Sequence, residues 1–150
     1  LVYLVPEVVV NLSRQMACDC NLLHPAACML SVADQVNASD HQRGFCLAEI
    51  REKNLELLVI KDDQLVTLNR YPVGSASDTV YHILNTYQQL ELNREKIPLM
   101  LAGQTHELDG AIQQMKRYIR KVSPLPYVIQ DLDAKYLPAH ILLAEATKCE

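Results

Sequence analysis

The spacing of hydrophobic residues changes about a third of the way along the chain. Between Glu7 and Met16 the apolar residues Val8, Val9 and Leu12 recur every three to four positions, which predicts an amphipathic helix. From residue 44 onwards the apolar residues recur every second position, which is typical of strands, whose side chains point alternately to the two faces of a sheet. The pattern therefore predicts a short helical region followed by a sheet.

Three further elements are expected in the front part of the chain. The stretch LVYLVP (1–6) is rich in β-branched residues and ends at a proline, which predicts a buried strand. DCNLLH (19–24) is expected to be a short strand or an extended link. PAACMLSVADQV (25–36) opens with a proline suited to a first helical turn and predicts a second helix. The polar stretch NASDHQRG (37–44) is then predicted to be a boundary between two units.

Three strand candidates follow the boundary: FCLAEIRE (45–52), LELLVIKD (55–62) and QLVTLNRYPV (64–73). The links between them are too short for a parallel crossover, so they predict an antiparallel meander. The middle segment carries apolar side chains at both odd and even positions. This predicts a strand that is covered on both of its faces.

Helices and strands are expected to alternate after the meander. We predict a helix with Ser77 as its N-cap and a parallel strand at IPLMLAG (97–103). A second helix is predicted with Thr105 as its N-cap, running to Val122. YVIQDL (127–132) and YLPAHILLAEATKC (136–149) predict a last strand and helix. The buried positions expected on the two helices that begin near Ser77 and Thr105 are Val80, Ile83, Leu84, Tyr87, Leu90, Leu108, Ala111, Ile112, Met115, Ile119 and Val122. The order after residue 44 is thus β-β-β-α-β-α-β-α, an α/β fold with a mixed sheet.

Composition narrows the classes of function. A formal net charge of −4 over 150 residues disfavours a nucleic-acid binder, which would carry a basic face. The basic stretch KRYIRK (116–121) is interpreted as the last turns of a helix, where cations complement the carbonyl end. We find no apolar run of the roughly 18–20 residues that a membrane span needs.

The odd number of cysteines, five, favours reduced thiols in a cytoplasmic protein over a disulfide framework. Cys18, Cys20, His24 and Cys28 lie close enough in sequence for a zinc site to be an alternative. Pro25 is expected to start the helix after His24, which leaves that histidine outside it. The spacing also matches no standard zinc pattern, so we predict no metal site.

A β-β-β-α-β-α-β-α unit preceded by β-α-β-α resembles the actin-like ATPase superfamily, whose two halves have a ribonuclease H-like, three-layer fold. The pieces NRYPVGSASDTVYHILNTYQQL (69–90), LMLAGQ (99–104) and the closing CE (149–150) are similar to an uncharacterised bacterial family, a domain of unknown function with that fold. The resemblance implies that residues 1–38 are the end of a first half and residues 44–150 the second half. It leads us to expect that the chain belongs to a longer protein.

The resemblance also implies where a nucleotide would bind. Active members carry an acidic residue in the hairpin of the second half, followed two positions later by glycine, and this turn holds phosphate and metal. Glu49 stands at the acidic position, but Arg51 replaces the glycine. Nucleotide binders end the later strand in two glycines, whereas this chain has Gly103 and Gln104. With Gly74, these residues are the candidates for cofactor binding.

The two departures, at Arg51 and Gln104, predict a degenerate actin-like module that acts in binding or assembly without phosphoryl transfer. We expect a protein partner or self-association, with Tyr118 as a candidate interface residue. No catalytic residue is predicted. The alternative is an active ATPase or kinase-like enzyme that binds ATP and magnesium, in which Glu49 helps to hold the metal.

Overall fold

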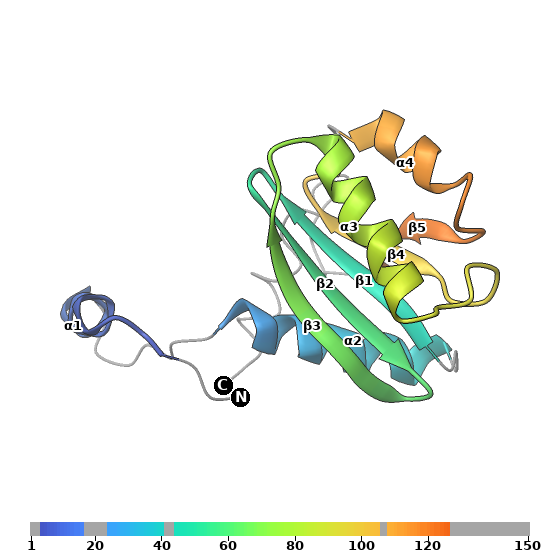
Figure 1. Cartoon of the computed structure of the whole chain (residues 1–150). Helices are drawn as coiled ribbons and strands as arrows, with labels where there is room; N and C mark the ends of the chain where they lie inside the picture. Colours follow the sequence, from blue (N-terminus) through green and yellow to red (C-terminus); the bar gives the residue numbers. More distant parts are fainter. Residues whose placement is uncertain (1–3, 17–23, 41–43, 106–107, 127–150) are drawn as a thin grey trace.

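The computed structural model describes residues 4–16, 24–40, 44–105 and 108–126 of the chain (Figure 1). The elements in chain order are α1 (Glu7–Met16), α2 (Pro25–Asp40), β1 (Gly44–Arg51), β2 (Asn54–Lys61), β3 (Gln64–Pro72), α3 (Ala76–Gln89), β4 (Leu99–Gly103), α4 (Asp109–Met115) and β5 (Val122–Pro124). The predicted strand at 127–132 and helix at 136–149 lie outside the described residues, as does the link DCNLLH apart from His24.

The five strands form one mixed sheet in the order β3-β2-β1-β4-β5. β1, β2 and β3 are antiparallel neighbours, joined by the two-residue turns Glu52–Lys53 and Asp62–Asp63. β4 pairs in parallel with β1, and β5 pairs in parallel with β4. The predicted meander and the predicted parallel strand are therefore both confirmed.

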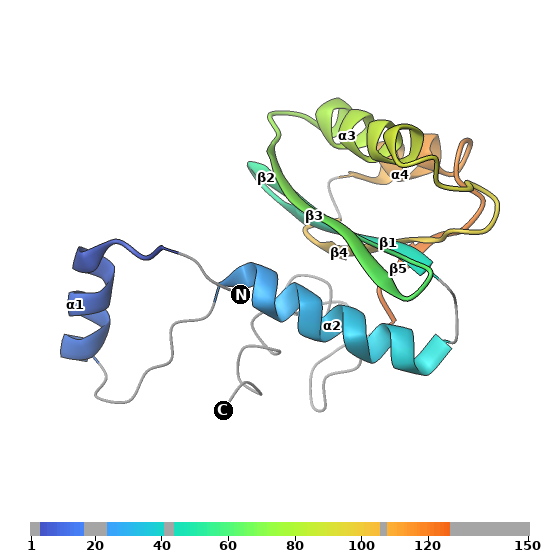
Figure 2. The same ribbon diagram turned by 60° about the horizontal axis from the view of Figure 1, so that its bottom comes forward.

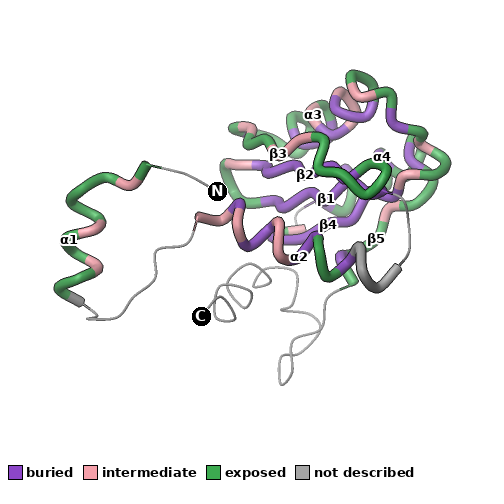
Figure 3. The backbone as a smooth tube through the Cα atoms, turned by 90° about the horizontal axis from the view of Figure 1, so that it is seen from below, coloured by how far each residue is buried: buried purple, intermediate pink, exposed green. Residues whose placement is uncertain are grey.

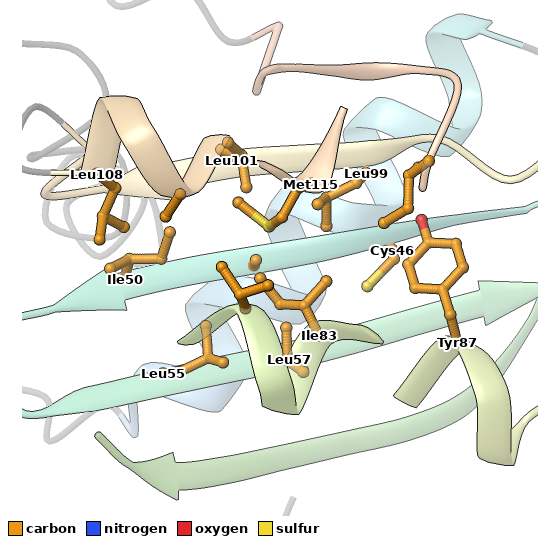
Figure 4. Close-up of a cluster of buried hydrophobic side chains, with 14 of the residues drawn as sticks. Cys46, Ile50, Leu55, Leu57, Ile83, Tyr87, Leu99, Leu101, Leu108 and Met115 are labelled. Atoms are coloured by element: carbon orange, nitrogen blue, oxygen red, sulfur yellow. The ribbon is translucent and has the colours of Figure 1, made fainter. Parts of the chain in front are cut away.

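Helices cover both faces of this sheet, which gives three layers (Figures 1 and 2). α3 and α4 lie on one face, where Cys46, Leu57, Ile83 and Tyr87 belong to a buried cluster (Figure 4). α2 lies on the other face, and its residues Met29 and Val32 join a second cluster with side chains of β1, β2 and β4. The middle strand β2 is consequently buried on both faces, as its sequence predicted.

α1 stands apart from the sheet and its helices (Figures 1 and 3). Its predicted bounds are confirmed, but its apolar residues Val8, Val9 and Leu12 are exposed. The strand predicted at LVYLVP is wrong over Leu4–Pro6, which are not in a strand, and Leu4 is fully exposed. A strand needs a neighbour to satisfy its backbone, and these three residues pair with no described strand.

α3 begins earlier than the sequence indicated. Its N-cap is Ser75 rather than Ser77, because the Ser75 hydroxyl accepts a hydrogen bond from the Asp78 amide at 3.2 Å. The carboxylate of Asp78 in turn accepts from the Gly74 amide at 2.9 Å. This reciprocal arrangement resembles a capping box. It satisfies the Asp78 amide, which the first turn leaves without a helical partner, and the Gly74 amide just before the helix.

α4 is shorter than predicted. It begins after Leu108, whose side chain makes no capping bond, so Thr105 is not the N-cap. The helix ends at Met115, and KRYIRK (116–121) forms a turn and an extended link rather than the last helical turns. The chain must turn back here, because Val122 pairs with Leu99 in the parallel ladder between β4 and β5. Val122 therefore belongs to a strand.

α2 confirms the predicted helix at 25–36 and extends it to Asp40, into the polar stretch expected to be a boundary. It packs against the sheet formed by the second predicted unit. The assignment of residues 1–38 to the end of a first half stays a prediction.

Candidate functional site

A pocket of about 160 Å³ lies where β1 and β3 end and α3 begins. Arg51, Gly74 and Gln104, three of the five candidate residues, line it. Glu49 and Gly103 do not belong to its lining. The remaining lining residues are Ile50, Glu52, Val73, Ser75, Ala76, Thr79 and Leu108. The structure thus brings three candidates together in the place where α/β sheets usually receive ligands.

Glu49 is buried, with only 5% of the residue exposed. It lies in β1 one residue before Ile50, so its side chain is on the opposite face of the sheet from the cluster that contains Ile50. Both of its carboxylate oxygens accept a hydrogen bond from Nε of Arg51, at 2.9 and 3.0 Å. Burial raises the pKa of Glu49, and the Arg51 guanidinium opposes that rise. The carboxylate is therefore held by a cation of its own strand.

Glu56, a residue that the sequence analysis did not single out, pairs directly with Glu49 across the β1–β2 ladder. It is 6% exposed, and its Oε1 lies 3.6 Å from Nε of Arg70 on β3. Its Oε2 is buried, and no donor in the described part of the chain bonds to it. The signal in the sequence was a single acid inside an otherwise apolar strand. At this end of the sheet two glutamates thus lie side by side, and each of them is paired with an arginine.

Gly103 ends β4 in a conformation that favours glycine, with φ of +84°. A Cβ at this position would overlap the carbonyl oxygen of Ile50 and lie 2.8 Å from its nitrogen. The Gln104 amide donates to that same carbonyl at 2.7 Å. The glycine therefore allows β4 to approach the backbone of β1, which accounts for it without a ligand.

The N-terminus of α3 faces the pocket, and two amides there are in use. The Asp78 amide donates to the Ser75 hydroxyl, and the Gly74 amide, just before the helix, donates to the Asp78 carboxylate. The Gly74 amide, followed by the Ser75 hydroxyl, holds the pKa of Asp78 below its usual range. A carboxylate of the chain thus stands where an external anion would be attracted by the helix N-terminus.

The alternative zinc site is only partly within the described residues, since Cys18 and Cys20 lie outside them. His24 precedes α2, as predicted, and its Nδ1 accepts a hydrogen bond from the Ala26 amide at 3.1 Å. Cys28 is buried in the cluster between α2 and the sheet. Over the described ranges, no three His, Cys, Asp or Glu side chains are grouped so that they could hold a metal ion.

Two other reactive groups are buried. Cys46 lies in the core, and burial raises the pKa of its thiol to about 12, which disfavours the reactive thiolate. Tyr87, also predicted to be buried, donates its hydroxyl hydrogen bond to the Ile97 carbonyl at 3.1 Å. Tyr81 and Tyr118 are exposed. Within the described segments, no helix has the length and apolar character of a membrane span.

Comparison with known proteins places the chain in a family. The family model described as "Protein of unknown function (DUF3822)" matches residues 1–122. A search of curated proteins gave no match.

Several solved structures are similar. One, from Bacteroides thetaiotaomicron VPI-5482, is described as a protein with actin-like ATPase fold and unknown function. It has a TM-score of 0.76 and 16% identity, over 97% of this chain and 52% of that one. The PilM–PilN type IV pilus biogenesis complex has a TM-score of 0.60 and 12% identity, over 85% and 52%. The AlfA filament bound to AMPPNP has a TM-score of 0.50 and 17% identity, over 75% and 41%.

These likenesses confirm the predicted actin-like α/β fold. The chain spans about half the length of the first two structures that it matches. At identities of 12–17%, these similarities establish a shared fold but give no information about ligands or partners of this chain.

Proposed function

Since the chain belongs to the DUF3822 family of proteins of unknown function and has the actin-like ATPase fold, we propose that it is a binding or assembly module without phosphoryl transfer. The proposal concerns this part of the fold.

The pairing of Glu49 with Arg51 carries this proposal. Magnesium is bound through one or two carboxylates that keep their charge and can reach the ion or its water shell. Glu49 stands at the position expected to serve this purpose, but it is 5% exposed and both its oxygens accept from Arg51. Removing the arginine from this contact would leave a buried carboxylate without its partner, so the pair resists opening. These residues do not fit a magnesium ion.

The surroundings fit a nucleotide no better. Pockets for ligands of that size have volumes of about 300–1,000 Å³, and the pocket beside α3 has about 160 Å³. The backbone at Gly103 is in contact with Ile50 rather than open to a nucleoside. The α3 N-terminus, which would attract a phosphate, holds the carboxylate of Asp78. No step of phosphoryl transfer is therefore assigned to this chain.

A protein partner is the class of ligand that we propose. The structures of similar fold include one named for a complex, PilM with PilN, and one named as a filament of AlfA. The net charge of −4 disfavours nucleic acid as the partner. Exposed tyrosines such as Tyr118 and Tyr81 are typical of protein interfaces. These observations support binding or assembly as the role.

Isothermal titration calorimetry of the purified chain with ATP and ADP, each with and without magnesium, tests the proposal. We expect no binding below the millimolar range and no release of phosphate in a parallel assay. Micromolar binding together with turnover would overturn the proposal in favour of an ATPase. In that case Glu49→Ala should abolish turnover while circular dichroism shows a folded protein, because Glu49 would then hold the metal.

A further inference from the structure

β3 is one of the two outer strands of the sheet, and no strand of the described residues lies along its outer side. Figure 1 shows it at one margin, with β5 at the other. In the described part of the chain, β3 pairs with β2 alone. Six of its nine residues are exposed, among them the apolar Leu65 and Val66. A long edge strand of this kind offers a row of backbone donors and acceptors to another strand.

The backbone groups that point outwards can be assigned from the ladder with β2. The Val73 amide donates to the Lys53 carbonyl at 3.0 Å, so this pair is a hydrogen-bonded one. Hydrogen-bonded and non-hydrogen-bonded pairs alternate in an antiparallel ladder. Tyr71 and Asn69, two and four residues before Val73, therefore bond inwards to β2. Leu68 and Arg70 direct their amides and carbonyls away from it.

We propose that β3 binds the β3 strand of a second copy of this chain in antiparallel orientation, so that two five-stranded sheets become one. Leu68 is the middle residue of Gln64–Pro72. With Leu68 of each copy on the twofold axis, all nine residues overlap and the outward groups of both strands meet. The strand is thus complementary to itself, as a twofold interface requires.

The charges of β3 agree with this register. Arg70 is the only charged residue among the nine. Pairing centred on Leu68 sets Arg70 against Val66 of the other copy, so that no like charges oppose each other. The register shift between Val59 and Ile60 leaves Val66 as the additional residue of β3, near one end. The regular part of the ladder, from Thr67 to Tyr71, includes the centre of the pairing.

This inference deepens the proposed function, since it names the partner as a second copy. The pairing through β3 and the proposed function can be refuted independently of each other. A monomeric chain that binds no nucleotide would refute the pairing and leave the binding role intact, whereas nucleotide turnover would refute the proposed function whatever the oligomeric state.

Sedimentation velocity over a concentration series of the whole chain tests the pairing. We expect a monomer–dimer equilibrium for the wild type. Val66→Glu should lower the dimer dissociation constant and Val66→Lys should raise it, on the order of tenfold apart, because each places its charge opposite Arg70 twice per dimer. Leu12→Lys, at an exposed apolar position of α1, is the matched control and should leave the equilibrium unchanged.

Cysteine crosslinking reads the register directly. Hydrogen-bonded partners have Cα atoms about 5.5 Å apart, within the reach of a disulfide. Leu68→Cys should therefore form a disulfide between the introduced thiols of the two copies, identified by peptide mass spectrometry, and Asn69→Cys should not. A wild type that stays monomeric at several hundred micromolar, a dimer lost in Leu12→Lys alone, or equal crosslinking at both positions would overturn the proposal.

Discussion

Replacing Gly103 by alanine tests whether this glycine serves the contact between strands or a ligand. Alanine would have to adopt φ near +84°, which costs about 1–2 kcal/mol. Its Cβ would also overlap the Ile50 carbonyl and lie 2.8 Å from the Ile50 nitrogen. Relief requires β4 to move away from β1, which weakens the 2.7 Å bond from the Gln104 amide. Together these effects should lower the free energy of unfolding by about 3–6 kcal/mol.

Gly110→Ala is the matched control. Gly110 is the second residue of α4, and nothing lies within 4 Å of the position that its Cβ would take. This substitution should leave stability unchanged or raise it by up to about 1 kcal/mol, because alanine is the better helix former. Urea denaturation followed by circular dichroism measures both variants. If Gly103→Ala unfolds within about 1 kcal/mol of the wild type, the structural explanation of this glycine is wrong and a ligand role regains its support.

Four further predictions concern the carboxylates and the core. The pKa of Glu49 is raised from 4.5, so the folded state keeps a proton that the unfolded state releases; stability should fall as pH rises from 4.5 through the folded pKa, and Glu49→Gln should remove this slope in urea melts at several pH values. For Asp78 the pH dependence of stability has the opposite sign. Because its pKa is lowered in the folded state, the ionised side chain stabilises the fold above pH 3.8, and this contribution should be lost in acid. The variant Asp78→Asn lacks the contribution at every pH and should not show this loss. Arg51→Ala should cost about 1–3 kcal/mol at pH 7, and a double-mutant cycle with Glu49→Gln should show coupling between the two side chains; additive effects would contradict the pair. Leu57→Ala, at a fully buried position, should cost about 2–5 kcal/mol, whereas Leu12→Ala should change stability by less than about 0.5 kcal/mol; equal losses would mean that α1 is packed.

The meander could be predicted because its signals are local. Alternation with period two and links of two residues fix antiparallel neighbours whatever lies around them. The end of α4 could not be predicted in the same way. The apolar spacing continues through Ile119, which is buried, although the helix stops at Met115 so that Val122 can reach the sheet. LVYLVP has the composition of a strand, but Leu4–Pro6 have no described strand beside them.

The sequence identified several residues of the candidate site but not the contacts between them. The family resemblance placed Glu49 at the acidic position of the hairpin and Arg51 at the position of the glycine, which identified both residues but not the bond between them. That the arginine binds the glutamate follows from burial, which makes an unpaired carboxylate costly. Glu56 was missed because its place opposite Glu49 depends on the register between strands. Asp78 was missed because its capping role depends on Ser75, whereas the sequence favoured Ser77 as the cap.

The central claim is that Arg51 holds the Glu49 carboxylate in the interior, where a magnesium nucleotide does not reach it. Carbon-13 NMR of the side-chain carboxyl of Glu49, assigned with Glu49→Gln, observes this group directly while magnesium and ATP are added to the wild-type chain. We predict that its resonance stays in place at millimolar concentrations of both, and that Arg51→Ala shifts it without any ligand. A selective, saturable shift of the Glu49 resonance by magnesium ATP would contradict the claim.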